Sequence, residues 1–244
     1  MNGEAIRELV QRLVDPKTLG GFLLSPPGWV VADPAALVKP GPQAEPLAVY
    51  TLGALRDYLT ANRDALELET LVVHVVSPQI VTVSGALQRA RTRETYVRAS
   101  ALNLTDGFLD KFMPIEAFIV GLQCRFVSTD DLKRVLTLFG HVKHETVKTS
   151  ADDGITQTVT AKQGVALVTE AAVPNPVTLQ PFRTFREVRQ PASPFVLRVQ
   201  AGPSGGLPTV GLFEADGGAW RLEAIAAVGG WLVHELPPGV KVLA

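Results

Sequence analysis

Three runs of β-branched and apolar residues, separated by short turns, constrain the fold more than any other feature of this sequence. Two of them, 71–76 and 80–84, flank Ser77-Pro78-Gln79, and the third covers residues 92–100. Valine, isoleucine and threonine favour extended backbone, and a proline-containing turn reverses the chain between two such runs. The pattern therefore predicts an antiparallel β-meander.

Helical spacing of apolar residues predicts helices at 3–15, 51–65, 113–126 and 128–140, and a last helix from Gly218 onward. Thr51 is a good N-cap, and Ser128, three residues before Asp131, resembles the start of a capping box. Further extended runs predict strands at 141–150, 155–163, 164–173, 194–202 and 209–216. An Asp-Gly pair at 153–154 predicts a hairpin between the first two of these strands.

Antiparallel strand pairs with helices grouped between them predict an α+β fold rather than a doubly wound parallel sheet. Six prolines fall within residues 20–46, where they remove backbone donors and disfavour helix in an irregular, partly extended segment. We therefore divide the chain into an N-terminal part, 1–69, and an α+β core region, 70–244. A single domain that includes both parts is the alternative.

The charge balance limits the partners that this chain can attract. With 23 basic and 24 acidic side chains the formal net charge is -1, which gives no general attraction to nucleic acid or to an anionic membrane. A charged fraction of 19% and a mean hydropathy of +0.19 predict that apolar surface contacts another subunit. The alternative is an alanine- and valine-rich composition without an interface.

The compartment predicted from the sequence is the cytoplasm, with no membrane partner. No uninterrupted apolar stretch approaches the ~20 residues that cross a bilayer. The single cysteine, Cys124, leaves no internal disulfide framework, and no secretory signal is visible at the N-terminus.

Residues with catalytic or metal-binding chemistry are few. His141 and His144 form H-x-x-H in a strand-like run, where a spacing of three places the two side chains on opposite faces. Cys124 lies in an apolar helix and is predicted to be a core residue. His74 and His234 stand in apolar contexts and are predicted to be packed or hydrogen-bonded. We therefore predict no metal, no cofactor and no enzymatic activity.

The stretch LFEADGGAWRLEAI, residues 212–225, predicts a strand, an acidic glycine turn and a helix capped by Asp216. The alternative is an anion site, because glycines at a helix N-terminus expose backbone N–H groups. Glu214 and Asp216 would repel a phosphate, which favours the cap. Gly229-Gly230 within this helix would each cost about 1 kcal/mol relative to alanine, so they predict a close packing neighbour or a bend.

Two arginine-rich segments are the best candidates for a binding surface. Arg89, Arg91 and Arg93 share one face if their segment is extended. A second set, Arg183, Arg186 and Arg189, flanks two aromatic residues, Phe182 and Phe185. Such arginines can contact nucleic acid, with aromatic stacking, but arginine-rich extended segments are more often solvated edges or pair with acids on neighbouring subunits. In a subunit interface they would form the polar rim, with Phe182 and Phe185 as its buried anchors.

Several stretches together resemble the YfdQ-like family of phage and prophage proteins. The matching pieces are 72–85, 113–126, 150–164, 179–199 and 212–225, in that order along the chain. The resemblance implies a phage-encoded cytoplasmic protein and carries over no catalytic residues.

The function predicted from these observations is that of a non-enzymatic, self-associating phage accessory protein. We expect a homo-oligomer larger than a dimer, ring-like or shell-like, with contacts through 181–191 and the proline-rich N-terminal region. One alternative is a nucleic-acid-binding phage protein that uses the arginine segments. Another is an anti-defence factor or enzyme whose site is assembled from residues distant in the sequence.

Overall fold

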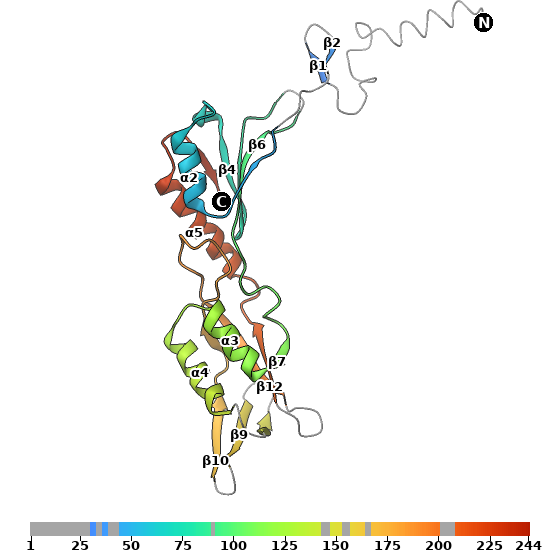
Figure 1. Ribbon diagram of the computed structural model, residues 1–244, viewed down its shortest axis with the longest axis vertical. Coiled ribbons are helices and arrows are strands. Elements are labelled where there is room, and N and C mark those ends of the chain that lie inside the picture. The colour runs from blue at the N-terminus through green and yellow to red at the C-terminus, as the bar shows by residue number, and fades with distance from the viewer. Residues whose placement is uncertain are drawn as a thin grey trace, which may run out of the picture. The chain divides into compact units, whose positions relative to one another are not determined.

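A computed structural model describes residues 30–32, 36–38, 44–88, 91–142, 147–152, 157–163, 167–200 and 208–244 (Figure 1). The chain forms two compact units, of which the first comprises Met1–Pro46 and Leu87–Arg93. Within it, β1 (Val30–Ala32) pairs antiparallel with β2 (Ala36–Val38). The helix predicted at 3–15 lies outside the described residues. The second unit, Leu47–Ala86 with Glu94–Ala244, contains the elements that follow.

A five-stranded sheet contains the predicted meander at its centre. Strands β4, β5 and β6 pair antiparallel, and the short strands β14 and β3 add a parallel edge on either side. In spatial order the strands are β14 (Lys241–Leu243), β4 (Val72–Ser77), β5 (Ile80–Ser84), β6 (Thr95–Ser100) and β3 (Leu47–Val49). The meander prediction is therefore confirmed.

Helices α2 (Leu52–Ala61) and α5 (Trp220–Glu235) cover one face of this sheet. The short 3-10 turn η1 (Leu68–Thr70) follows α2 along the chain and leads into β4. Alternate strand residues point at the helices because side chains on a strand alternate between faces. Val73, Val83 and Val97 lie in register on this face and are fully buried. Thr51 caps α2, since its Oγ1 accepts a hydrogen bond from the N–H of Ala54 at 3.1 Å, as predicted.

A second, four-stranded sheet is antiparallel throughout. Its order is β11 (Val177–Leu179), β12 (Ser193–Gln200), β13 (Thr209–Glu214) and β7 (Phe112–Pro114). Helices α3 (Ile115–Arg125) and α4 (Asp130–Val142) share one apolar core with it. Aromatic rings dominate this core: Phe108 stacks with Phe118 at 5.9 Å between centroids, and Phe118 meets Phe139 edge-on at 5.3 Å.

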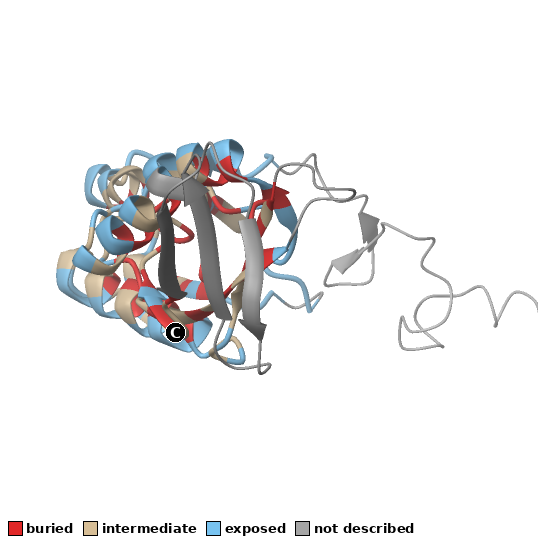
Figure 2. Ribbon diagram, turned by 90° about the horizontal axis from the view of Figure 1, so that it is seen from below, coloured by how far each residue is buried: buried red, intermediate tan, exposed pale blue. Residues whose placement is uncertain are grey.

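The third sheet is a three-stranded antiparallel ladder of β10 (Leu167–Val173), β9 (Gln157–Gln163) and β8 (Val147–Asp152). With helices grouped between mostly antiparallel sheets, the fold class is α+β, as the sequence predicts. Figure 2 shows buried residues on the inner sides of the helices and exposed residues on their outer sides. In the part of the chain that the structure describes, no helix combines the length and apolarity needed to cross a membrane.

Helix α4 differs from its prediction at both ends. Thr129, not Ser128, caps it, because the Thr129 Oγ1 accepts a hydrogen bond from the N–H of Leu132 at 3.2 Å. The helix also continues past Gly140 to Val142, so His141 belongs to the helix and not to a strand. Gly140 therefore lies inside the helix and does not end it.

Two helical glycines make a matched test of this packing. A Cβ on Gly121 of α3 would lie 2.0 Å from the ring of Phe108, whereas a Cβ on Gly140 of α4 would have no neighbour within 4 Å. We expect Gly121→Ala to lower the free energy of unfolding by about 1–3 kcal/mol through overpacking. Gly140→Ala should raise it by about 0.5–1 kcal/mol, since alanine favours helix. Urea titrations measure both, and equal effects would contradict this account of the core.

Candidate functional site

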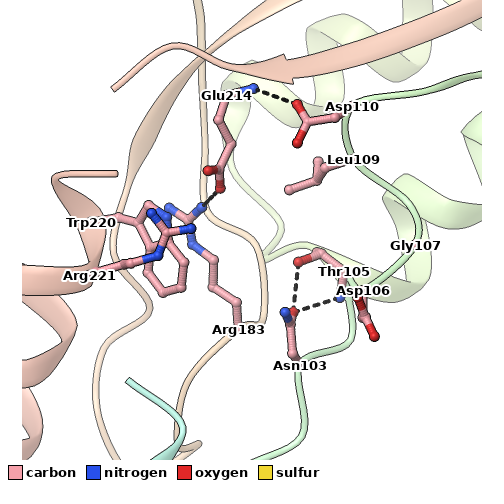
Figure 3. A pocket seen from close by; sticks show the side chains of 10 residues that line it. All are labelled: Asn103, Thr105, Asp106, Gly107, Leu109, Asp110, Arg183, Glu214, Trp220 and Arg221. Atoms are coloured by element: carbon pink, nitrogen blue, oxygen red, sulfur yellow. Dashed lines mark hydrogen bonds and ion pairs between the residues drawn. The ribbon is translucent and has the colours of Figure 1, made fainter. Parts of the chain in front are cut away.

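A cavity of about 300 Å³ lies where β13 leads into α5 (Figure 3). Three parts of the chain line it: a loop before β7, the extended segment that contains Arg183, and the turn from Glu214 to Arg221. The lining residues are Asn103, Thr105, Asp106, Gly107, Leu109, Asp110, Arg183, Glu214, Trp220 and Arg221. Polar and charged groups predominate in this set.

The guanidinium of Arg183 forms the wall of the cavity, and its side chain is only 1% exposed. Its Nη1 pairs with the Glu214 carboxylate, its Nη2 donates to the Ser193 hydroxyl, and its Cζ lies 3.8 Å from the centre of the Trp220 ring. Burial lowers the pKa of Arg183 to about 10, while the nearby Glu214 and Asp216 carboxylates act in the opposite direction. Arg183 is thus a charged group at neutral pH, held inside the protein by ion pairing and cation–π contact.

Asp216 is not the N-cap of α5 as predicted, because a turn over 216–219 precedes the helix and Ala219 is its N-cap residue. The Asp216 carboxylate accepts hydrogen bonds from the N–H groups of Gly218, at 2.9 Å, and Trp220, at 3.2 Å, and from the Ser193 hydroxyl at 2.8 Å. Gly217 and Gly218 have φ of 61° and 84°, a left-handed backbone that favours glycine. Because Asp216 occupies the N–H groups that a phosphate would need, the turn is not an open anion site.

Burial of Asp216 opposes its ionisation, but the hydrogen bonds from Gly218, Ser193 and Trp220 and the charge of Arg183 outweigh burial, so its pKa is lowered. The ionised carboxylate therefore links the start of α5 to β12 through Ser193.

The loop before β7 supplies the opposite side of the cavity. Asn103 Oδ1 accepts hydrogen bonds from the Thr105 N–H and hydroxyl, which fixes a local turn. Asp110 has a left-handed φ of 59°, its N–H donates to the Leu212 carbonyl, and its carboxylate accepts a long hydrogen bond of 3.4 Å from the Glu214 N–H. This loop is not among the sites predicted from the sequence, although NLTDGFLD has the Asn, Asp and Gly content that is typical of structured turns.

Several polar groups of the cavity have no partner among the described residues. The Nε of Arg183 and the Nε1 of Trp220 are buried donors without an acceptor. At the rim, Arg221 makes a cation–π contact with Trp220 at 5.1 Å and, in the described part of the chain, has no carboxylate within ion-pair distance. Unsatisfied buried N–H groups are rare in native proteins and call for an explanation.

The first arginine segment does not form the predicted extended row. Arg91 has a left-handed φ of 58° and donates its N–H to the Gln88 carbonyl, so the backbone is not extended at Arg91. Arg91 and Arg93 are exposed, whereas Arg89 lies outside the described residues. The alternation on which a shared arginine face depends is therefore interrupted at Arg91.

The second arginine segment is divided between the interior and the surface. Arg183 is buried, whereas Arg186 and Arg189 are exposed, and Arg186 stacks on Phe182 at 3.6 Å. Phe185 is 1% exposed and packs in the core beneath α2 and α5. Because Arg183 and Phe185 are buried within their own chain, they have no surface with which to contact a partner. The predicted contact with a subunit or with nucleic acid is thus left to Phe182, Arg186 and Arg189.

The cysteine and histidines also differ from expectation. Cys124 is exposed on α3, so the prediction that it is a core residue is wrong. His74 is exposed, and His234 is exposed and lies 3.0 Å from the Glu235 carboxylate, so neither is packed, although His234 is hydrogen-bonded. His144 lies outside the described residues. Within the described ranges, no three histidine, cysteine, aspartate or glutamate side chains are grouped for a metal ion.

Comparisons of this chain with protein-family models, with curated proteins and with solved structures find no match. The geometry of the site is therefore the basis for the proposals below.

The hydrogen bonds that the Asp216 carboxylate accepts lead to a pH-dependent prediction. Since the folded state lowers the pKa of Asp216, its contribution to stability is present above the ordinary aspartate pKa of about 4 and is lost as pH falls through the folded value. We expect Asp216→Ala to lower the free energy of unfolding by about 1–2 kcal/mol at pH 7. The gap between wild type and Asp216→Asn should shrink as the pH falls toward 3. A gap that is constant with pH, measured by urea titration, would exclude a contribution from the charge.

Proposed function

We propose that the protein is a non-enzymatic, self-associating phage or prophage accessory protein and that the outer face of α5 is one of its subunit contacts. The supporting observation is an uncovered apolar stripe on this helix. Leu222 and Val233 are 74% and 71% exposed, more than any other large apolar residue of the described chain. Ala226 and Gly230 lie between them and are exposed as well.

These four residues, which we call the α5 stripe, lie on one side of the helix. Their spacings of four, four and three residues match the helical repeat, so their side chains follow one another along a single face. The opposite side of α5 packs into the core through Ala224, Val228 and Leu232. A helix that is apolar on both sides is ordinarily buried on both sides.

Gly230 supports a close approach by another chain. Each glycine in a helix costs about 1 kcal/mol relative to alanine. Gly229 is explained within the chain, because a Cβ there would lie 2.4 Å from the Cβ of Ala244, but a Cβ on Gly230 would meet nothing within 4 Å. Small residues on an exposed apolar stripe allow two helix backbones to approach closely.

The order of sizes along the α5 stripe is symmetric: large, small, small, large. In an antiparallel pair of α5 helices related by a two-fold axis, Leu222 of one copy would meet Val233 of the other, and Ala226 would meet Gly230. A two-fold contact requires this kind of self-complementarity.

Such a two-fold contact closes at a dimer, so a larger assembly needs a second contact. The edge strand β3 is the candidate, because Leu47 in the strand and Tyr50 directly after it are 52% and 70% exposed, and an exposed strand edge can pair with another chain. The proline-rich residues 20–46 lead directly into this strand. We propose that the two contacts together build a homo-oligomer larger than a dimer.

Gly230→Gln tests the α5 contact. The side chain has room in the isolated chain and favours helix more than glycine does, so folding should be retained or improved. In the oligomer it would separate the two helices. By light scattering we expect a wild-type mass that is a multiple of 26.1 kDa and a smaller mass for Gly230→Gln, with an unchanged circular dichroism spectrum.

Gly140→Gln is the matched control, since Gly140 also lies on an exposed helix surface with nothing within 4 Å. It should keep the wild-type mass. A wild type that stays at about 26 kDa at all concentrations would exclude self-association, and a Gly230→Gln variant with the wild-type mass would exclude the α5 contact. A ratio of absorbance at 260 and 280 nm that indicates bound nucleic acid would favour the nucleic-acid alternative.

A further inference from the structure

The five-stranded sheet has a second face, opposite α2 and α5, which we call the open sheet face. Val73, Val83 and Val97 point toward the helices, so the residues next to them along each strand point away from the helices. One row of residues in register crosses all five strands on this side. From β14 to β3 the row is Leu243, His74, Thr82, Arg98 and Ala48.

The charges on the open sheet face have one sign. The five strands, all of them within the described residues, contain Lys241, Arg98 and His74 and no aspartate or glutamate. Lys241 belongs to this face because it is in register with Val72, two residues before His74 on β4. The chain as a whole has 23 basic and 24 acidic side chains, so this sheet concentrates positive charge locally.

These basic side chains are exposed and are not used within the chain. In the part of the chain that the structure describes, neither Arg98 nor Lys241 has a carboxylate within ion-pair distance. Cross-strand pairs of opposite charge stabilise a solvated sheet, but the neighbours of Arg98 in register are Thr82 and Ala48. The face therefore lacks the charge balance of an ordinary solvated surface and is complementary to an anion.

Hydroxyl and apolar side chains occupy the rest of the open sheet face. Thr82 supplies a hydroxyl in the central row, and Ser100 supplies another beside Ile80. Leu243 and Val76 are 56% and 48% exposed. A simple anion would contact only the cations, whereas a polymer with anionic and apolar parts would cover the whole face. Nucleic acid has both parts, in its phosphates and its bases.

Shape decides between single-stranded and double-stranded nucleic acid. Five strands spaced about 4.8 Å apart make a sheet about 19 Å across, which is too wide for a major groove of about 12 Å. The bases of a duplex are stacked inside it, so Leu243 and Val76 would stay uncovered. A single strand can follow the twist of the sheet and lay its bases against these side chains.

We infer that the open sheet face binds single-stranded nucleic acid without sequence preference, with phosphates at Arg98 and Lys241. His74 lies in the row between these two cations and adds a hydrogen-bonding ring. No phenylalanine or tryptophan occurs in the five strands, so phosphate contacts dominate over stacking. The inference does not rest on the proposed self-association, because no residue of the α5 stripe lies on this face.

Fluorescence anisotropy with a labelled oligothymidylate of about ten nucleotides, within the usual site size of single-strand binders, provides the test. At low salt the oligonucleotide should bind the full-length protein at concentrations up to about 100 µM. Each phosphate contact contributes about −0.7 to the slope of log K against log salt, so two contacts should give about −1.4. A duplex of the same length should bind at least tenfold more weakly, and oligoglutamate should not compete.

A pair of double variants locates the binding. Arg98→Gln with Lys241→Gln should weaken binding about tenfold and bring the salt slope close to zero. Lys133→Gln with Arg134→Gln is the matched control, since it removes the same net charge from exposed positions on α4. This control should bind like the wild type. All four positions are exposed, so the fold should persist, which a circular dichroism melt checks.

Arg186→Gln with Arg189→Gln separates the open sheet face from the arginine segment predicted from the sequence. Weakening by this variant, together with unchanged binding by the Arg98 and Lys241 variant, would overturn the inference. No binding at low salt would also overturn it, as would equal binding of the duplex, competition by oligoglutamate, or an equal loss in the α4 control. Gly230→Gln should bind the short oligonucleotide normally, so failure of the proposed assembly and failure of this inference are distinguishable.

Discussion

The buried guanidinium of Arg183 is the interaction on which the arrangement of the surrounding elements depends. Its Nη1 contacts Glu214 at the end of β13, its Nη2 contacts Ser193 at the start of β12, and its plane covers Trp220 at the start of α5. Ser193 in turn donates to Asp216, whose carboxylate also accepts a hydrogen bond from the N–H of Trp220, the first residue of α5. A buried charge is expensive unless its partners surround it, so the loss of one partner would leave an uncompensated charge in the interior. Two strands and a helix are thereby held to one geometry.

The segment around Arg183 also joins the two apolar cores of the second unit. The side-chain oxygen of Gln190 accepts hydrogen bonds from the N–H groups of Arg183 and Thr184. Thr184 donates its hydroxyl to the Pro78 carbonyl, and Gln79 donates its side-chain amide to the Arg183 carbonyl, which ties the segment to the β4–β5 turn. Proline-interrupted chain has few regular backbone partners, and here side chains supply them.

The sequence predicts the features that depend on neighbours along the chain. The Thr51 cap and the β4–β5 turn are examples, because their partners lie within a few residues. The exposure of Cys124 could also have been predicted from helical spacing. Ile115, Phe118 and Leu122 define the buried face of α3, and Cys124 lies outside this face. The burial of Arg183 follows instead from partners 10 and 31 residues away, which no local pattern relates to it. The cavity was missed for the same reason: its three lining segments meet only in the folded chain.

Helix α5 shows how one element satisfies two constraints. Its first turn, with Trp220 and Arg221, belongs to the cavity, whereas the α5 stripe continues along the outer face to Val233. The pair Gly229-Gly230 reflects this division, because Gly229 accommodates the chain's own Ala244 and Gly230 faces outward with free space.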